Sequence, residues 1–126
     1  MFRSMALGCM LVSVATATFA LPAKSPDAAL AGRVAGAPVE CLPTFGGDRG
    51  GQSYDSGDIL YRGSGNVVYV NHPEDCGIIR SDRVIVSRTP TQQCRGDIIE
   101  VRDRISPAGF GSCALSSFIP YKKAPK

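Results

Sequence analysis

The sequence predicts an all-β domain, a small antiparallel β-barrel or sandwich of about five strands that is cross-linked by two disulfides. Three observations lead to this fold class. Short runs of β-branched and aromatic residues alternate with Gly, Pro, Asn and Asp from Cys41 onward. No helical period is sustained over the roughly 11 residues that a helix prediction needs. Four cysteines, an even number, remain after residues 1–20 are set aside.

Residues 1–20 have the layout of a signal peptide. One charged residue, Arg3, precedes an apolar or small stretch from Met5 to Ala20. We expect cleavage after Ala20, with Ala23 as the second choice, and therefore export to the periplasm or the extracellular space. Cys9 ends a lipid-attachment-like box, but the apolar run continues well past it, which argues against lipidation.

Cleavage would leave 106 residues, enough for one domain with one small core. Residues 21–39 are rich in Ala, Pro and Gly without a sustained period, which predicts a flexible leader before a single disulfide-bonded domain over residues 40–126. Loss of Arg3 reduces the basic residues from 14 to 13 against 11 acidic ones, a net charge of about +2. So small a value gives no electrostatic argument for a nucleic-acid or a membrane partner, and we predict no nucleic-acid partner. No later segment reaches the roughly 18 apolar residues of a membrane span.

Five segments carry the strand signal. The Gly-rich segment 45–57 before them predicts a long loop or a poorly formed first hairpin. The clearest hairpin joins two of the five through Gly63-Ser64-Gly65-Asn66. The last segment is expected to break or bulge near Ser116-Ser117 and lacks a ladder donor at Pro120. The predicted strands are residues 58–62, 67–71, 83–89, 97–102 and 112–121.

The four remaining cysteines predict two disulfides, because a small exported domain gains stability from cross-links that restrict the unfolded chain. They are Cys41, Cys76, Cys94 and Cys113. Four cysteines allow three pairings, and their spacing does not choose among them.

No catalytic, metal or cofactor site is predicted. His72, Asp75 and Cys76 are ligand types within five residues, but the turn at Pro73 and a disulfide at Cys76 explain them without a metal. A Ser/His/Asp site would depend on His72 alone, since it is the one histidine, and no Gly-x-Ser-x-Gly motif is present. Aspartates near strand ends are typical acceptors for turn N–H groups.

Arginines and tyrosines in or beside the strands give one candidate polar binding face for an anionic partner such as a phosphate or an acidic glycan. The favoured interpretation is a solvated sheet surface with cross-strand ion pairs to Glu100, Asp103 or Asp82. The residues of the candidate face are Arg62, Tyr61, Tyr69, Arg88 and Arg102.

Arg95-Gly96-Asp97 is a tripeptide that some secreted proteins use to bind cell-surface receptors. Here it follows Cys94 directly and runs into Ile98, which leaves little room for a projecting loop. We therefore interpret Gly96 as a bend and Asp97 as the residue that enters a strand.

Several stretches together resemble a family of small exported proteins of unknown function from Gram-negative bacteria, sphingomonads and relatives especially. They are LAGRVAGAPVECLP (30–43), ILYRGSGNVVYVNHP (59–73), VIVSRT (84–89), QQCRGDIIEVRD (92–103) and LSSFIPYKK (115–123). Members with two cysteines keep those matching Cys41 and Cys94, and others add counterparts of Cys76 and Cys113. The resemblance implies pairing of Cys41 with Cys94 and of Cys76 with Cys113. It brings no activity or cofactor, and the segment 45–56 fits the family pattern least.

The function expected from the sequence is that of a non-enzymatic binding or envelope-associated domain, whose partner is an unidentified protein or envelope component. The first alternative is a small inhibitor of a protease or glycosidase, because Ser87 to Gln93 is a polar, Pro-containing loop next to a disulfide cysteine. The second alternative is a small hydrolase that uses His72 or an aspartate pair. Neither the ligand nor the oligomeric state follows from the residues.

Overall fold

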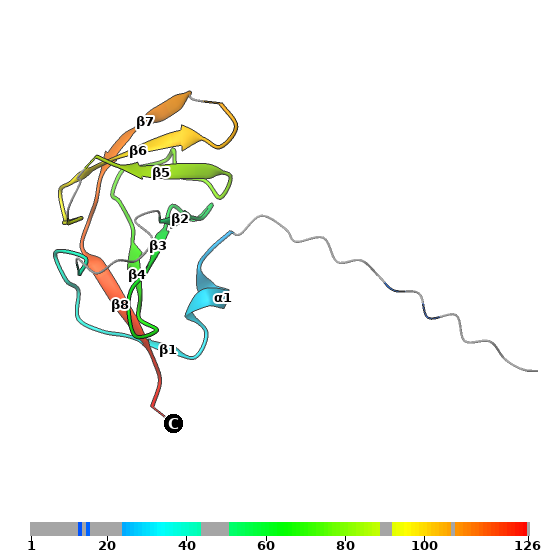
Figure 1. Ribbon diagram of the computed structural model, residues 1–126, viewed down its shortest axis with the longest axis vertical. Coiled ribbons are helices and arrows are strands. Elements are labelled where there is room, and N and C mark those ends of the chain that lie inside the picture. The colour runs from blue at the N-terminus through cyan, green and yellow to red at the C-terminus, as the bar shows by residue number, and fades with distance from the viewer. Residues whose placement is uncertain are drawn as a thin grey trace, which may run out of the picture.

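A computed structural model describes residues 13, 15, 24–43, 51–88, 92–106 and 108–125 (Figure 1). Within these residues the chain forms two antiparallel sheets and one short helix, with two disulfides, which confirms the predicted fold class. The elements are α1 (Asp27–Leu30), β1 (Arg33–Ala35), β2 (Gln52–Ser53), β3 (Ile59–Arg62), β4 (Val68–Asn71), β5 (Arg83–Ser87), β6 (Ile98–Asp103), β7 (Gly109–Ala114) and β8 (Phe118–Lys123).

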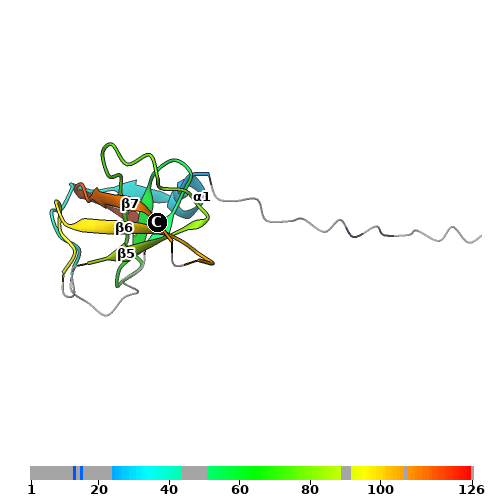
Figure 2. The same ribbon diagram turned by 90° about the horizontal axis from the view of Figure 1, so that it is seen from above.

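The larger sheet has the strand order β1-β8-β4-β3-β2, and the smaller sheet has the order β5-β6-β7. In Figure 1 the smaller sheet lies across the upper end of the molecule, and Figure 2 looks down on it from above. The two sheets meet where β2 approaches β5, because the Ser53 hydroxyl donates a hydrogen bond to the carbonyl oxygen of Arg83 at 2.6 Å. The molecule is therefore a sandwich of two sheets that are linked at one edge.

Four of the predicted strands correspond to β3, β4, β5 and β6, whose β-branched and aromatic runs carry the signal. The fifth predicted segment is divided into β7 and β8, and the break falls at residues 115–117, as expected. The two halves belong to different sheets. The chain therefore crosses from the smaller to the larger sheet at this break.

The main core lies between the sheets. Alternation along β3 directs Ile59 and Tyr61 into it, and Phe118 of β8 packs edge-on against Tyr61 with ring centroids 5.7 Å apart. The smaller sheet supplies buried aliphatic side chains from β5 and β6. The buried members of this core are Ile59, Tyr61, Cys76, Ile79, Ile85, Ile99, Val101, Leu115 and Phe118.

A second, smaller core covers the opposite face of the larger sheet. It contains Tyr54, Leu60, Val68 and Val70, and α1 packs Ala29 and Leu30 against it. Residues 21–39 were predicted to be a flexible leader. The structure corrects this for the described part, since α1 covers the core and β1 pairs with β8. Burial of the α1 side chains and the β1 backbone pairing outweigh the low intrinsic propensity of this Ala- and Gly-rich segment.

The predicted signal peptide and the Gly-rich segment fall partly outside the described residues. Residues 1–20, the predicted signal peptide, are outside except for Ser13 and Ala15, and so are residues 44–50 of the Gly-rich segment. The rest of that segment contains β2, which pairs with β3 through Gln52 and Leu60. Gly51 lies directly before β2. A Cβ atom at this position would be 2.2 Å from Ile59 Cγ2, so only glycine fits without a shift of the neighbouring side chain. Over the ranges given above, no helix is long and apolar enough to cross a membrane.

Candidate functional site

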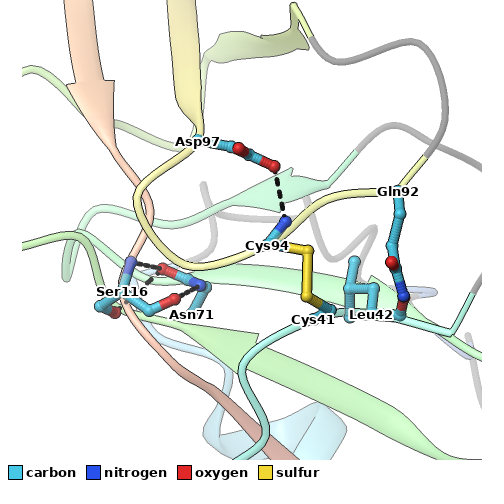
Figure 3. Close-up of a disulfide and its surroundings, with 7 residues drawn as sticks. All are labelled: Cys41, Leu42, Asn71, Gln92, Cys94, Asp97 and Ser116. Carbon is cyan, nitrogen blue, oxygen red and sulfur yellow. Dashed lines mark hydrogen bonds between the residues drawn. A yellow bond between two sulfur atoms is a disulfide. The ribbon is translucent and has the colours of Figure 1, made fainter.

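The two disulfides join Cys41 to Cys94 and Cys76 to Cys113, the pairing that the resemblance implies. Cys76 and Cys113 belong to the main core and its border. Cys41 and Cys94 form an isolated antiparallel bridge with their Cα atoms 3.9 Å apart (Figure 3). Backbone hydrogen bonds flank this bridge on both sides, from Leu42 N to Gln93 O and from Arg95 N to Glu40 O. The bridge therefore fixes the chain at the entry to β6.

The Arg95-Gly96-Asp97 tripeptide is a turn, as the sequence analysis proposed. Gly96 has φ +88°, a conformation that glycine adopts without steric cost, and Asp97 N donates to the carbonyl oxygen of Cys94 at 3.0 Å. The Asp97 carboxylate accepts the N–H of Cys94 at 2.7 Å (Figure 3). Because this carboxylate is turned back onto its own chain, it is not displayed as a receptor ligand.

Asn71 is a structural residue that the sequence analysis missed. It is fully buried, its Nδ2 donates to the Ser116 carbonyl oxygen at 2.7 Å, and its Oδ1 accepts the Ser116 N–H at 3.0 Å (Figure 3). The Ser116 hydroxyl lies 2.8 Å from the carbonyl oxygen of His72. The side chain of Asn71 thus pairs with the backbone of the crossover between β7 and β8, as a neighbouring strand would.

The structure does not bring the predicted polar face together. Tyr61 is buried in the main core and Tyr69 packs against it, whereas Arg62 follows Tyr61 in β3 and so lies on the opposite face of that sheet. Arg88 and Arg102 belong to the region of the smaller sheet, far from this strand in the topology. The five residues therefore do not form one surface.

Arg88 and Arg102 instead share one carboxylate, that of Glu100. Arg88 donates from Nε to Oε1 at 2.8 Å, and Arg102 donates from Nε to Oε2 at 3.0 Å. Terminal nitrogens of both guanidinium groups also contact it. The hydrogen bond from Arg88 is the main cause that holds the pKa of Glu100 below its ordinary value, and the hydrogen bond from Arg102 is the next. The predicted cross-strand ion pair to Glu100 is found for Arg88, whereas Arg102 lies two residues from Glu100 on the same strand.

Acid is expected to reduce stability through Glu100. Its folded-state pKa lies below the ordinary value of 4.5, so the stabilisation is fully present above pH 4.5 and is lost as the pH falls through the folded-state pKa. Urea unfolding measured at decreasing pH should show a shallower decline for Glu100→Gln than for the wild type. Glu74→Gln removes an exposed carboxylate that has no ion pair among the described side chains, and it serves as the control. Identical acid dependence in the wild type and Glu100→Gln would contradict this expectation.

His72 has a carboxylate partner. Its Nδ1 lies 2.8 Å from Oδ1 of Asp58, and Ser56 donates its hydroxyl to the other carboxylate oxygen at 2.7 Å. A histidine oriented by a carboxylate is half of a general-base arrangement, but a nucleophile must contact the second ring nitrogen. Here the serine contacts the carboxylate instead, and the imidazole is 61% exposed. Cys76 is oxidised, and the described ranges hold no cluster of three His, Cys, Asp or Glu side chains suited to a metal ion.

The sequence suggested Ser87 to Gln93 as an inhibitory loop. Residues 89–91 of this loop lie outside the described residues. Its described arginine, Arg88, has its guanidinium group on Glu100. An arginine that enters a protease specificity pocket must project freely. The ion pair therefore argues against Arg88 in that role.

The turn between β6 and β7 displays an apolar side chain that sequence analysis did not single out. Ile105 is 97% exposed, although the backbone around it is ordered by hydrogen bonds. Asp103 Oδ1 accepts the N–H groups of Ile105 at 2.8 Å and Ser106 at 3.3 Å, and Ala108 N donates to Ser106 Oγ at 3.1 Å. The backbone hydrogen bond from Ile105, and after it that from Ser106, lowers the pKa of Asp103 and so keeps this acceptor ionised. The lone apolar residue within RDRISP was the available signal.

Two further apolar side chains lie at the same end of the smaller sheet. Val84, 39% exposed, is opposite Arg102 in the register, and Phe110, 41% exposed, follows the turn at the start of β7. The Phe110 ring covers the guanidinium carbon of Arg83 at 3.7 Å. We call Ile105, with Phe110 and the Arg83 that it covers, the turn surface, whereas Val84 alternates with Arg83 to the other face of β5. Aromatic and arginine groups are enriched at protein interfaces.

In comparisons with known proteins, the sequence matches no protein-family model, no curated protein and no solved structure.

Proposed function

We propose that the protein is a non-enzymatic binding domain of an oxidising, extracytoplasmic compartment, and that the turn surface is where its protein partner binds. The observation that carries the proposal is the display of Ile105, 97% exposed, on a turn whose backbone is held by Asp103. An apolar side chain whose own backbone N–H is already held by a hydrogen bond loses less conformational entropy on binding. The two disulfides support the compartment, because such bonds persist where the environment is oxidising.

The export route and the relation to small exported Gram-negative proteins are part of the same proposal. A domain with two disulfides in 126 residues fits a secreted scaffold. The hydrolase alternative has one favourable observation, the contact between His72 and Asp58. Turnover of ester or glycoside substrates by the purified protein, abolished in His72→Ala, would replace the binding proposal with that alternative.

The proposal predicts that Ile105→Ser weakens capture of the partner about tenfold, since an isoleucine side chain contributes roughly 1.5–3 kcal/mol when it is fully buried. Stability should change by less than about 0.5 kcal/mol because the side chain is solvent-exposed. Ile98→Ser is the matched control, because Ile98 is 42% exposed at the far end of β6.

The measurement is site-specific photo-crosslinking in intact producing cells, with the photoreactive residue at position 105 or at position 98. A discrete adduct at 105 that is absent at 98, and that an excess of unlabelled wild-type protein suppresses but Ile105→Ser does not, is the expected result. Equal adducts at both positions, or none at 105, would show that the turn surface is not the contact.

A further inference from the structure

The opposite end of the larger sheet concentrates positive charge. Three segments form this end: β1, the hairpin of β3 and β4, and the end of β8. In the sequence, residues 28–39, 59–73 and 104–126 contain no aspartate or glutamate. The cations of this end are Arg33, Arg62, Lys122 and Lys123, and we call them together the cationic end. The small net charge of the whole chain conceals this segregation.

The strand register places these four residues close together. Arg62 of β3 is opposite Val68, and Val68 is opposite Tyr121 of β8, so Arg62 and Tyr121 are two strands apart, about 10 Å. Lys123 is opposite Arg33 of β1. Lys122 alternates to the other face, so the cations surround the end of the sheet instead of covering one face. In Figure 1 this end lies at the bottom, where the chain leaves β8, away from the smaller sheet.

The charges of this end are not neutralised within the described part of the chain. Arg62, Lys122 and Lys123 are exposed and form no ion pair there. Arg33 donates to the backbone carbonyl oxygens of Asn66 and Tyr121, which ties β1 to the hairpin tip without cancelling its charge. The ion-paired carboxylates belong to Asp58, Glu40 and Glu100, which lie outside the three segments. A ligand of opposite charge would therefore meet four available cations.

An exposed aliphatic residue lies at the same end of the sheet. Val34 is 57% exposed and shares a face with Lys122, which is opposite it in the register. The half-buried Tyr121 lies on the other face, with Arg33, Arg62 and Lys123. Basic residues that surround apolar and aromatic side chains are typical of surfaces that bind the headgroup region of a bilayer. A nucleic acid would also bind the cations through its phosphates. It has, however, no acyl region in which Val34 could be buried.

We propose that the cationic end docks the protein onto the surface of an anionic lipid bilayer. The docking is peripheral: lysine and arginine groups neutralise lipid phosphates, while Val34 enters the boundary between headgroups and acyl chains. It uses residues separate from the turn surface, which lies at the other end of the molecule. The two proposals therefore stand or fall independently.

The test is co-sedimentation of the purified, fully oxidised protein with vesicles of phosphatidylglycerol and phosphatidylethanolamine, compared with vesicles of phosphatidylcholine alone. We expect binding to the anionic vesicles only, with loss of binding at high salt because the screening length shrinks to about 3 Å at 1 M. Arg62→Gln combined with Lys123→Gln should weaken binding about thirtyfold, and Val34→Ser about fivefold.

The control is Arg80→Gln combined with Arg95→Gln, which changes the net charge equally but alters exposed arginines outside the three segments. It should retain nearly all the binding. Equal binding to both vesicle types would overturn the proposal, as would an equal loss in the control. Binding to soluble polyglutamate or to duplex DNA with no binding to anionic vesicles would likewise overturn it and assign the cationic end to an acidic macromolecule.

Discussion

Replacing Cys41 and Cys94 together by serine is expected to lower the free energy of unfolding by about 4 kcal/mol. The bond spans 53 residues of sequence, so its loss returns a large loop entropy to the unfolded chain. It also releases the bridge at the entry to β6, where the turn at Gly96 begins. Since small domains are stable by only about 5–15 kcal/mol, the loss is a large part of the total.

Equilibrium urea unfolding of the oxidised double variant and the wild type, followed by circular dichroism, measures this effect. Cys76→Ser with Cys113→Ser is the comparison, because that bond spans 37 residues and loop entropy alone predicts a nearly equal cost. The comparison variant should lose more, since it also places a serine hydroxyl at the buried position 76. An unfolding midpoint of the Cys41/Cys94 variant equal to that of the wild type would contradict the expected role of the bridge.

Asn71→Ala is expected to cost about 3 kcal/mol. The substitution removes the hydrogen-bond partners of both the N–H and the C=O of Ser116, at a site where Asn71 itself is fully buried. Each buried backbone group that loses its partner costs roughly 1–3 kcal/mol. Because these bonds hold the crossover between the sheets, amide hydrogen exchange at Ser116 should accelerate in the variant.

Ser116→Ala is the matched control, because it removes one hydroxyl and keeps both bonds between Asn71 and the backbone. It should cost about 1 kcal/mol, the usual net contribution of one hydrogen bond. If Asn71→Ala were no more destabilising than Ser116→Ala, water or a shifted backbone would be satisfying the crossover, and the structural role given to Asn71 would be wrong.

The strands that could be predicted are those whose own side chains carry the signal. VVYVN and DIIEVR have the alternation of buried and exposed positions that a sheet requires, and they became β4 and β6. The start of β7, before the predicted residue 112, could not be predicted, because Gly109 and Gly111 carry no apolar side chain and pair with β6 through the backbone. The same holds for β1, whose pairing depends on β8, distant in the sequence. Local patterns do not record such long-range partners.

The candidate sites show a related limit. Adjacent strand residues such as Tyr61 and Arg62 point to opposite faces, so the period of two could already have separated them. The pair of Arg88 with Glu100 could be predicted, since Glu100 was named as a cross-strand partner, but the pair of Arg102 with Glu100 lies within one strand. The cationic end could not be predicted from the net charge, because net charge is a sum over the whole chain and does not show which charges lie close together in the fold. Arg33 and Lys123 become neighbours only through the register of β1 and β8.

The position of β8 inside the larger sheet has a consequence for the order of events during biosynthesis. β8 lies between β1 and β4, and its contact with Arg33 joins residues 88 apart in the sequence. While residues 118–123 are still inside the ribosome, β1 has no partner and the main core lacks Phe118. β2, β3 and β4 can pair with one another as they emerge, but β1 joins the larger sheet only after almost the whole described chain has been synthesised.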